Sequence, residues 1–113
     1  TLLSLAGVPV PDNMTGLDLH GLYAESPEHW REDFYYDHPY GHGGRIPRTV
    51  GVRGEQFVYT RYVDSQPNFE QLFDLKEDPD QLVNLADHPD YSERLRSMRR
   101  RCDELAREVG RRP

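Results

Sequence analysis

Apolar residues recur at helical spacing near the end of the chain. They lie three or four positions apart, and the positions between them are almost wholly charged: Tyr91, Leu95, Met98, Cys102, Leu105 and Val109. A stripe with this period is typical of an amphipathic helix that buries one face. Gly110 suits the end of such a helix, and Asp90 or Ser92 suits its N-terminal cap. The pattern therefore predicts a long helix over 91–109.

The middle of the chain alternates with the period of two that is typical of strands. Val50 and Val52 share one face, and four segments are predicted as strands: 34–36, 48–53, 56–63 and 69–75. Gly54-Glu55 is short enough to close a hairpin between the second and third strands. We therefore predict an α+β fold with an N-terminal extended segment. Its sheet, of about four antiparallel strands, would pack against one long C-terminal amphipathic helix.

The start of the chain resembles the end of a helix. Leu2, Leu3, Leu5 and Ala6 are typical of the last turns of a buried helix, and Gly7 suits the position after it. Because no N-terminal cap precedes them, we interpret 1–113 as a single C-terminal subdomain cut from a larger protein. In this interpretation 1–33 is a connecting segment, 34–75 forms the sheet, and 76–113 forms a turn and the helix. The alternative is a short natural protein with a processed N-terminus.

Composition narrows the class of protein. The 113 residues are 35% hydrophobic and 30% charged, and they leave room for one modest core. A single cysteine excludes an internal disulfide framework, and no apolar run approaches the length of a membrane span. Cys102 lies on the apolar stripe, so we interpret it as a small buried side chain rather than a nucleophile.

Charge is divided unevenly along the chain. Residues 91–113 hold eight of the 14 basic side chains, whereas 1–90 hold 16 of the 20 acidic ones. A basic segment can indicate nucleic-acid binding, but the net charge of −6 repels phosphate backbones. We therefore expect the arginines of the helix to pair with the acidic body, and we expect no nucleic-acid or membrane partner.

Functional side chains are densest between the first two predicted strands. The segment 37–48 holds three glycines and the candidate substrate-binding residues His38, His42, Arg45 and Arg48. Glycines let the backbone approach a ligand, and guanidinium groups match sulfate, phosphate or carboxylate oxygens. The segment thus indicates a loop that faces an anion or a sugar. The alternative without a binding role is a glycine-rich hairpin loop with solvated histidines.

A metal site from Asp37, His38 and His42 is disfavoured. The spacing of the two histidines suits a metal only on a helix, and Pro39 and the glycines prevent a helix there. No nucleophile with a neighbouring base can be assembled from the chain, so no catalytic residue and no metal ligand is assigned.

Three motifs in order resemble the arylsulfatase-like family. Thr1–Val8 with Thr15–Leu19 is similar to its "PTLLxLAG…P…GxSL" segment, and Gly51–Tyr59 is similar to its "GVRTxxYKYI" strands. Phe69–Ala86 resembles its "ELYDLxxDPxExxNLA" signature, in which we interpret Asp78-Pro79 as a turn and Asn84-Leu85-Ala86 as a short helical turn. The resemblance covers essentially the whole chain.

The resemblance implies the C-terminal subdomain of a sulfatase, a sulfuric ester hydrolase, that is inactive alone. It implies an N-terminal catalytic domain as partner, with a formylglycine made from a Cys/Ser-x-Pro-x-Arg motif and a divalent metal, calcium. Neither group is expected in this chain, because Cys102 is followed by Asp-Glu-Leu. The loop 37–48 would then line the rim of a site for a sulfated carbohydrate. The alternatives are a non-enzymatic helix-on-sheet interaction module and a fragment of a related phosphodiesterase or phosphonate hydrolase.

Overall fold

The computed structural model describes residues 1–12, 14, 16–24, 30–39 and 47–110, and it divides the chain into two compact units, 1–31 and 32–113. Each unit is described by itself. Within the described residues, no helix is both long enough and apolar enough to cross a membrane.

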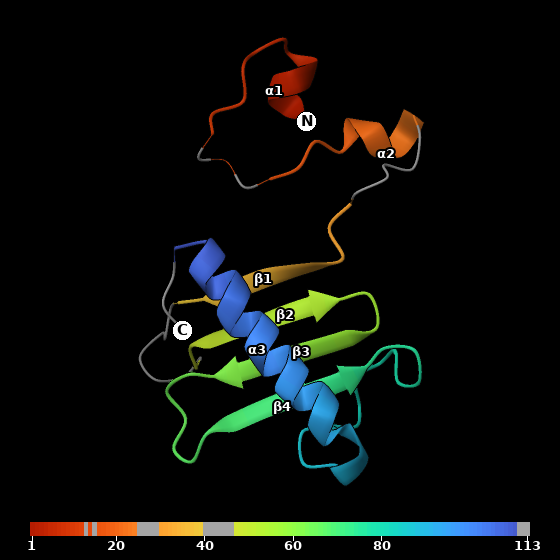
Figure 1. Ribbon diagram of the computed structural model, residues 1–113, viewed down its shortest axis with the longest axis vertical. Helices are drawn as coiled ribbons and strands as arrows, with labels where there is room; N and C mark the ends of the chain where they lie inside the picture. The colour runs from red at the N-terminus through yellow and green to blue at the C-terminus, as the bar shows by residue number, and fades with distance from the viewer. Residues whose placement is uncertain (13, 15, 25–29, 40–46, 111–113) are drawn as a thin grey trace. The chain divides into compact units, whose positions relative to one another are not determined.

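The second unit is built on a four-stranded antiparallel sheet with the strand order β1-β2-β3-β4 (Figure 1). The strands follow one another in the chain as β1 (Asp33–His38), β2 (Thr49–Gly54), β3 (Phe57–Tyr62) and β4 (Phe69–Asp74). The predicted sheet is confirmed, and the predicted strand ends are within one residue of the observed ones, except that β1 extends two residues past Tyr36. Register pairs Val50 with Arg61 and Val52 with Tyr59, so the two valines of β2 share a face with these residues of β3.

One long helix, α3 (Ser92–Glu108), lies diagonally across one face of this sheet (Figure 1). The core forms between them, where Val50, Val52, Tyr59 and Leu72 are fully buried against Leu95, Met98, Cys102 and Leu105. Burying each aliphatic side chain of this size contributes about 1.5–3 kcal/mol. The predicted amphipathic helix is therefore confirmed, and its apolar stripe faces the sheet.

The start of α3 differs from the prediction. A short 3₁₀ turn, η1 (Pro89–Tyr91), leads into the helix, and the Nδ1 atom of His88 accepts a hydrogen bond from the N–H of Asp90 at 3.3 Å. No side chain caps α3 at Tyr91, so the predicted cap at Asp90 or Ser92 is wrong. The end agrees with the prediction, because Gly110 has a positive φ of 71°.

The outer edge of β4 is covered by a short extended segment. The N–H of Leu85 donates to the carbonyl of Leu72 at 2.8 Å, and the side chain of Asn84 bonds to the same edge. The interpretation of Asn84-Leu85-Ala86 as a helical turn is therefore wrong. The N–H of Leu85 and the side chain of Asn84 pair with the strand, and the N–H of Ala86 donates to Oδ1 of Asn84 at 3.1 Å.

The first unit holds two short helices, α1 (Leu2–Leu5) and α2 (His20–Ala24). Gly7 follows α1 with a positive φ of 67°, as predicted. Leu2 and Leu5 are exposed, so within this chain they do not belong to a buried helix. The hydroxyl of Thr1 accepts a hydrogen bond from the N–H of Leu19 at 2.7 Å, which joins the start of the unit to the residue before α2.

Candidate functional site

The predicted loop joins β1 to β2, and the structure describes both of its ends. His38 is the last residue of β1, is exposed, and pairs in register with Thr49. Arg48 directly precedes β2, and its carbonyl accepts a hydrogen bond from the N–H of Val63 at 3.0 Å. His42 and Arg45 lie outside the described residues. The two ends therefore meet at one end of the sheet, where His38 ends β1 and Arg48 directly precedes the neighbouring strand β2.

Arg48 has hydrogen-bonding capacity that the described chain does not use. Its side chain is half-buried, and its Nε atom is buried without a hydrogen-bond partner in the described chain. Arg48 also forms no ion pair with any described carboxylate. An unpaired donor on a cationic group is suited to an anion that comes from outside this domain.

The described residues do not support a metal site at this loop. Asp37 pairs in register with Val50, whose side chain faces α3, whereas His38 pairs with Thr49 on the opposite face. Side chains of successive strand residues diverge, so these two cannot converge on one ion from within β1. No group of three or more His, Cys, Asp or Glu that could hold a metal occurs among residues the structure describes.

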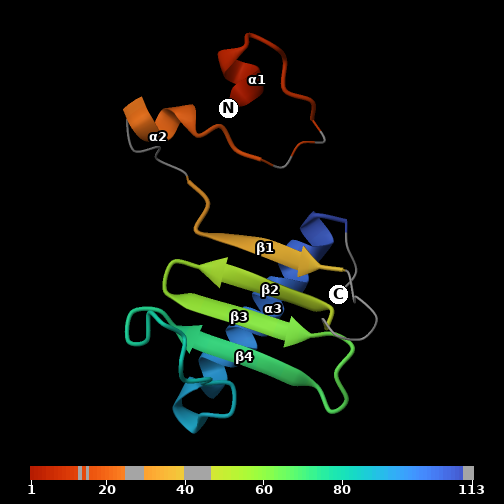
Figure 2. The ribbon, with the colours of Figure 1, turned by 180° about the vertical axis from the view of Figure 1, so that it is seen from behind.

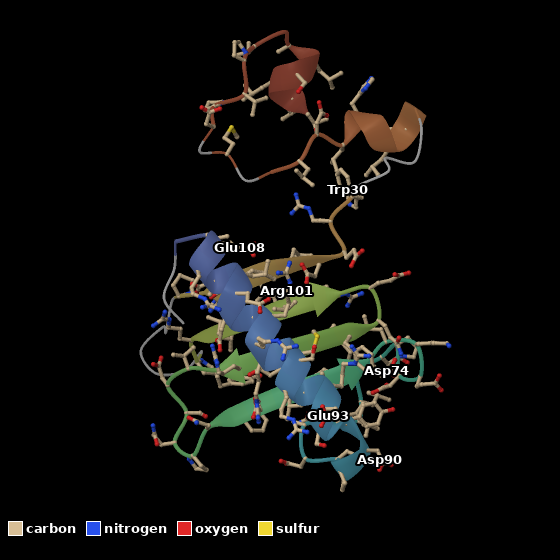
Figure 3. The ribbon with its side chains drawn as sticks, viewed as in Figure 1. Trp30, Asp74, Asp90, Glu93, Arg101 and Glu108 are labelled. Carbon is tan, nitrogen blue, oxygen red and sulfur yellow. The ribbon has the colours of Figure 1, made fainter. Side chains whose placement is uncertain are left out.

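Three ion pairs join α3 to the sheet. Arg101 reaches Asp33 with two hydrogen bonds, Nε to Oδ2 at 2.7 Å and Nη2 to Oδ1 at 2.9 Å. This forked contact raises the pKa of Arg101 further above its usual value. Figure 3 shows Arg101 on α3, in the same helix as Glu108, which lies 3.5 Å from its Nη1 atom. Arg61 on β3 donates to Asp103 at 2.8 Å, and Arg99 pairs with Glu70.

Glu70 accepts hydrogen bonds from both Arg99 and Tyr59. Arg99 Nε donates to its Oε2 at 2.9 Å, and the hydroxyl of Tyr59 donates to the same oxygen at 2.8 Å. Hydrogen bonding from Arg99, helped by Tyr59, lowers the pKa of Glu70. Burial, together with this acceptor, raises the pKa of Tyr59. The network thus keeps Glu70 ionised and Tyr59 neutral. Through Arg99 it joins α3 to β4.

Two of the hollows that flank α3 carry paired charges on their walls, and Arg94, which also borders the first of them, lies over the ring of Phe57 at 4.5 Å. One, of about 320 Å³, lies over Val52 and Phe57 and is bordered by Asp33, which Arg101 neutralises. The other, of about 350 Å³, is bordered by Arg61 and Arg99, each bound to a carboxylate. Paired charges in such positions stabilise packing and offer little to an incoming anion.

Cys102 is not a nucleophile in this fold. It is fully buried under α3, and burial raises the pKa of its thiol to about 11. The thiolate is the reactive form, and it is scarce at neutral pH under these conditions. The prediction of a small buried side chain is confirmed. Cys102 is therefore assigned to the core and not to a reactive site.

The sequence predicted that ion pairs would form between α3 and the strands, but it did not predict which residues would form them. Charge distribution predicted that the arginines of the helix would pair with the acidic body, but no spacing singled out the pairs themselves. The partners of Arg101 and Arg61 lie 68 and 42 positions away in the chain. Periodicity along a single element carries no information about such contacts.

A protein-family model described as N-sulphoglucosamine sulphohydrolase, C-terminal, matches residues 1–108. An arylsulfatase of Clostridium perfringens is 32% identical over 100 residues, which are 88% of this chain and 20% of that protein. The Delta 4,5-hexuronate-2-O-sulfatase of Bacteroides thetaiotaomicron is 35% identical over 111 residues, 92% of this chain and 21% of that protein.

A solved structure described as a 2-O GAG sulfatase superimposes with a TM-score of 0.85 at 30% identity. The match covers 97% of this chain and 24% of that one. The chain therefore spans about a fifth of the length of the curated relatives named above, and it matches their sequence across most of its own length.

Proposed function

Because the chain belongs to the family of sulfatase C-terminal domains, we propose that it completes a sulfuric ester hydrolase whose reactive groups reside in an N-terminal catalytic domain. The observation that carries the proposal is the match to that family over residues 1–108, with sulfatase relatives at 30% identity or more. The relatives favour neither a separate interaction module nor a phosphodiesterase. The domain of this chain would then serve as structural support and as part of the substrate rim.

The formylglycine and the divalent metal of the family do not fit the described residues of this chain. Cys102 is fully buried, and its sequence context, Cys-Asp-Glu-Leu, is not that of a formylglycine precursor. No described cluster could hold a metal ion. Both groups therefore belong, in this proposal, to the catalytic domain, and this chain supplies neither.

The contribution of this chain to the site is the loop between β1 and β2. His38 and Arg48 stand at its two ends, and Arg48 keeps an unused donor. With His42 and Arg45 they would form hydrogen bonds to the sulfate or carboxylate groups of a sulfated carbohydrate. The Bacteroides thetaiotaomicron relative, a hexuronate-2-O-sulfatase, supports this class of substrate. Rim contacts of this kind act on substrate binding and leave bond cleavage to other groups.

The activity is tested by assaying the full-length protein with 4-nitrophenyl sulfate, a 2-O-sulfated hexuronate and 4-nitrophenyl phosphate. Hydrolysis of a sulfate ester in preference to the phosphate supports the proposal. Preference for the phosphate would overturn it in favour of a phosphohydrolase. The 113-residue chain assayed alone is expected to be inactive, and turnover by it would contradict the assignment of the reactive groups to another domain.

The rim contacts are tested with Arg48→Gln, Arg45→Gln and His42→Ala in the full-length protein. Loss of one charged hydrogen bond of about 1.4 kcal/mol would lower kcat/KM for the sulfated sugar about tenfold, mainly through KM. Arg96→Gln is the control, because Arg96 is exposed on α3 and, among the described residues, pairs with Glu93 of its own helix. Unchanged kcat/KM in all three loop variants would remove the loop from the site.

A further inference from the structure

The face of the sheet opposite α3 carries no described helix or strand of residues 32–113. Figure 2 shows this face from behind, with α3 on the far side of the strands. Register assigns twelve side chains to it in three rows of four, here called the open face: Phe34, Tyr36, His38, Thr49, Gly51, Arg53, Val58, Thr60, Tyr62, Phe69, Gln71 and Phe73. Five of the twelve are phenylalanine or tyrosine.

The two faces of the sheet differ in charge. The face under α3 includes Asp33, Arg61 and Glu70, and each of these pairs with a residue of the helix. The open face holds no carboxylate at all, although the chain contains 20 acidic residues, and its single permanent charge is Arg53. Depletion of charge with enrichment of aromatic residues is the composition of the buried core of an interface.

Four polar side chains of the open face are bonded in two pairs. The hydroxyl of Tyr36 contacts that of Thr60, and the hydroxyl of Tyr62 donates to the side-chain oxygen of Gln71 at 3.0 Å. The ring of Tyr62 also stacks on Phe69 with centroids 4.9 Å apart. Hydroxyls that are paired in this way can be covered by apolar atoms without losing hydrogen bonds.

The size of the face suits a contact between domains. Four strands of six residues measure about 20 Å by 19 Å, a footprint of ~400 Å² that would bury at most ~800 Å² when both partners are counted, within the range of interfaces between domains. Val58 and Phe73 on this face already expose only 8% of their surface. Phe34 and Phe69 still expose 46% and 47% of their surface, so they are the large apolar groups that a partner would cover. The relatives contain four fifths of their length outside the part matched here.

We infer that the open face is the surface on which the N-terminal catalytic domain of the same polypeptide docks. The inference rests on the proposed sulfatase architecture and adds the location of the contact. Arg53 argues against a second copy of this chain as the partner, because no carboxylate on an identical face could pair with it. A different surface can supply one, and a carboxylate of the catalytic domain opposite Arg53 is therefore expected.

Hydroxyl-radical footprinting of the full-length protein tests the contact without requiring activity. The labelling rate of each residue is compared with its own rate in the urea-unfolded protein. A covered face gives Phe34 and Phe69 protection of about tenfold or more, because the core of an interface excludes water, whereas a free face gives about twofold from their exposed fractions. Leu82, with 80% of its surface exposed, is the internal control and is expected to label near its unfolded rate. Twofold protection of both phenylalanines would overturn the inference.

A photo-cross-link identifies what covers the face. With p-benzoylphenylalanine in place of Phe69, a cross-link to a peptide of the catalytic domain supports the inference. A cross-link to residues 1–31, or to a second molecule in a sedimenting dimer, overturns it. Failure of the sulfatase proposal is read separately, because a full-length protein that cleaves no sulfate ester can still show a protected open face.

Discussion

The side-chain oxygen of Asn84 accepts a hydrogen bond from the backbone N–H of Leu72 at 3.0 Å, on the outer edge of β4. The amide nitrogen of Asn84 donates to the carbonyl of Glu70 at 3.1 Å, so one side chain satisfies a donor and an acceptor of the same strand. An uncovered strand edge presents such groups in a row and invites pairing with another chain. The side chain of Asn84 thus forms the hydrogen bonds that a neighbouring strand would otherwise provide at this edge.

Asn84→Ala should lower the free energy of unfolding by about 1–3 kcal/mol, since it leaves the N–H of Leu72 without a partner in a half-buried position. Urea unfolding of the chain measures the loss. Asn84→Asp keeps the acceptor for Leu72 but loses the donor to Glu70, so its loss should be smaller than that of the alanine variant. Asn68→Ala, at an exposed amide in the preceding turn, should change little. An alanine variant as stable as the wild type would contradict the role of Asn84.

Gly51→Ala should destabilise the sheet by about 3 kcal/mol through overpacking. A Cβ atom at position 51 would overlap the ring of Tyr36 and the carbonyl oxygen of Tyr59. Gly54→Ala is the matched control on the same strand, because its Cβ would lie at an ordinary 3.5 Å from the carbonyl oxygen of Phe57. Chemical unfolding of both variants decides the matter. Equal losses would show that the close approach of Tyr36 is not what requires glycine.

Acid stability should depend on Glu70. The fold lowers its pKa below the ordinary 4.5, so the stability that its carboxylate contributes is present above that value and lost as the pH falls through the lowered pKa. Glu70→Gln should cost about 1 kcal/mol at pH 7 and should flatten the fall in stability between about pH 5 and pH 3. Glu93→Gln is the control, because Glu93 is exposed and pairs only within α3. An unchanged slope in the Glu70 variant would rule out this linkage.

The Cys102 thiol should react with an aromatic disulfide reagent only when the domain opens. With a pKa of about 11, roughly one thiol in a thousand is ionised at pH 8, and the side chain is fully buried. In an Arg96→Cys, Cys102→Ala variant the single thiol is exposed, and it should react at the rate of a free peptide. The labelling rate of Cys102 should rise with urea in step with unfolding. Rapid labelling of the folded wild type would disprove the burial of this side chain.

The elements that were predicted correctly are marked in the sequence by the spacing of apolar residues within a few positions. The spacing of Leu95, Met98 and Leu105 is a property of one helix, and the alternation of Val50 and Val52 is a property of one strand. The helix α2 was not predicted, because five residues that include Gly21 have weak helical preference. The predicted cap of α3 failed for a related reason, since His88 acts through a 3₁₀ turn that the sequence pattern does not mark.

The candidate loop was located from its composition, and the structure describes its two ends. Glycines, histidines and arginines between two strands marked 37–48, and register brings His38 beside the residue that follows Arg48. The roles of these side chains remain a proposal, since their contacts are expected with atoms outside this chain. The unused donor of Arg48 could not be predicted, because burial depends on how strands and helix pack.

The amino-acid sequence by itself determined the elements, the buried stripe of α3 and the family resemblance, since each is written in local spacing or in contiguous motifs. Tertiary structure alone decided which arginine meets which carboxylate, how Asn84 closes the edge of β4, and that the sheet keeps one aromatic face free of acidic residues. These features join residues that are distant in the chain, and their energies depend on distance and exposure, which only the folded arrangement defines.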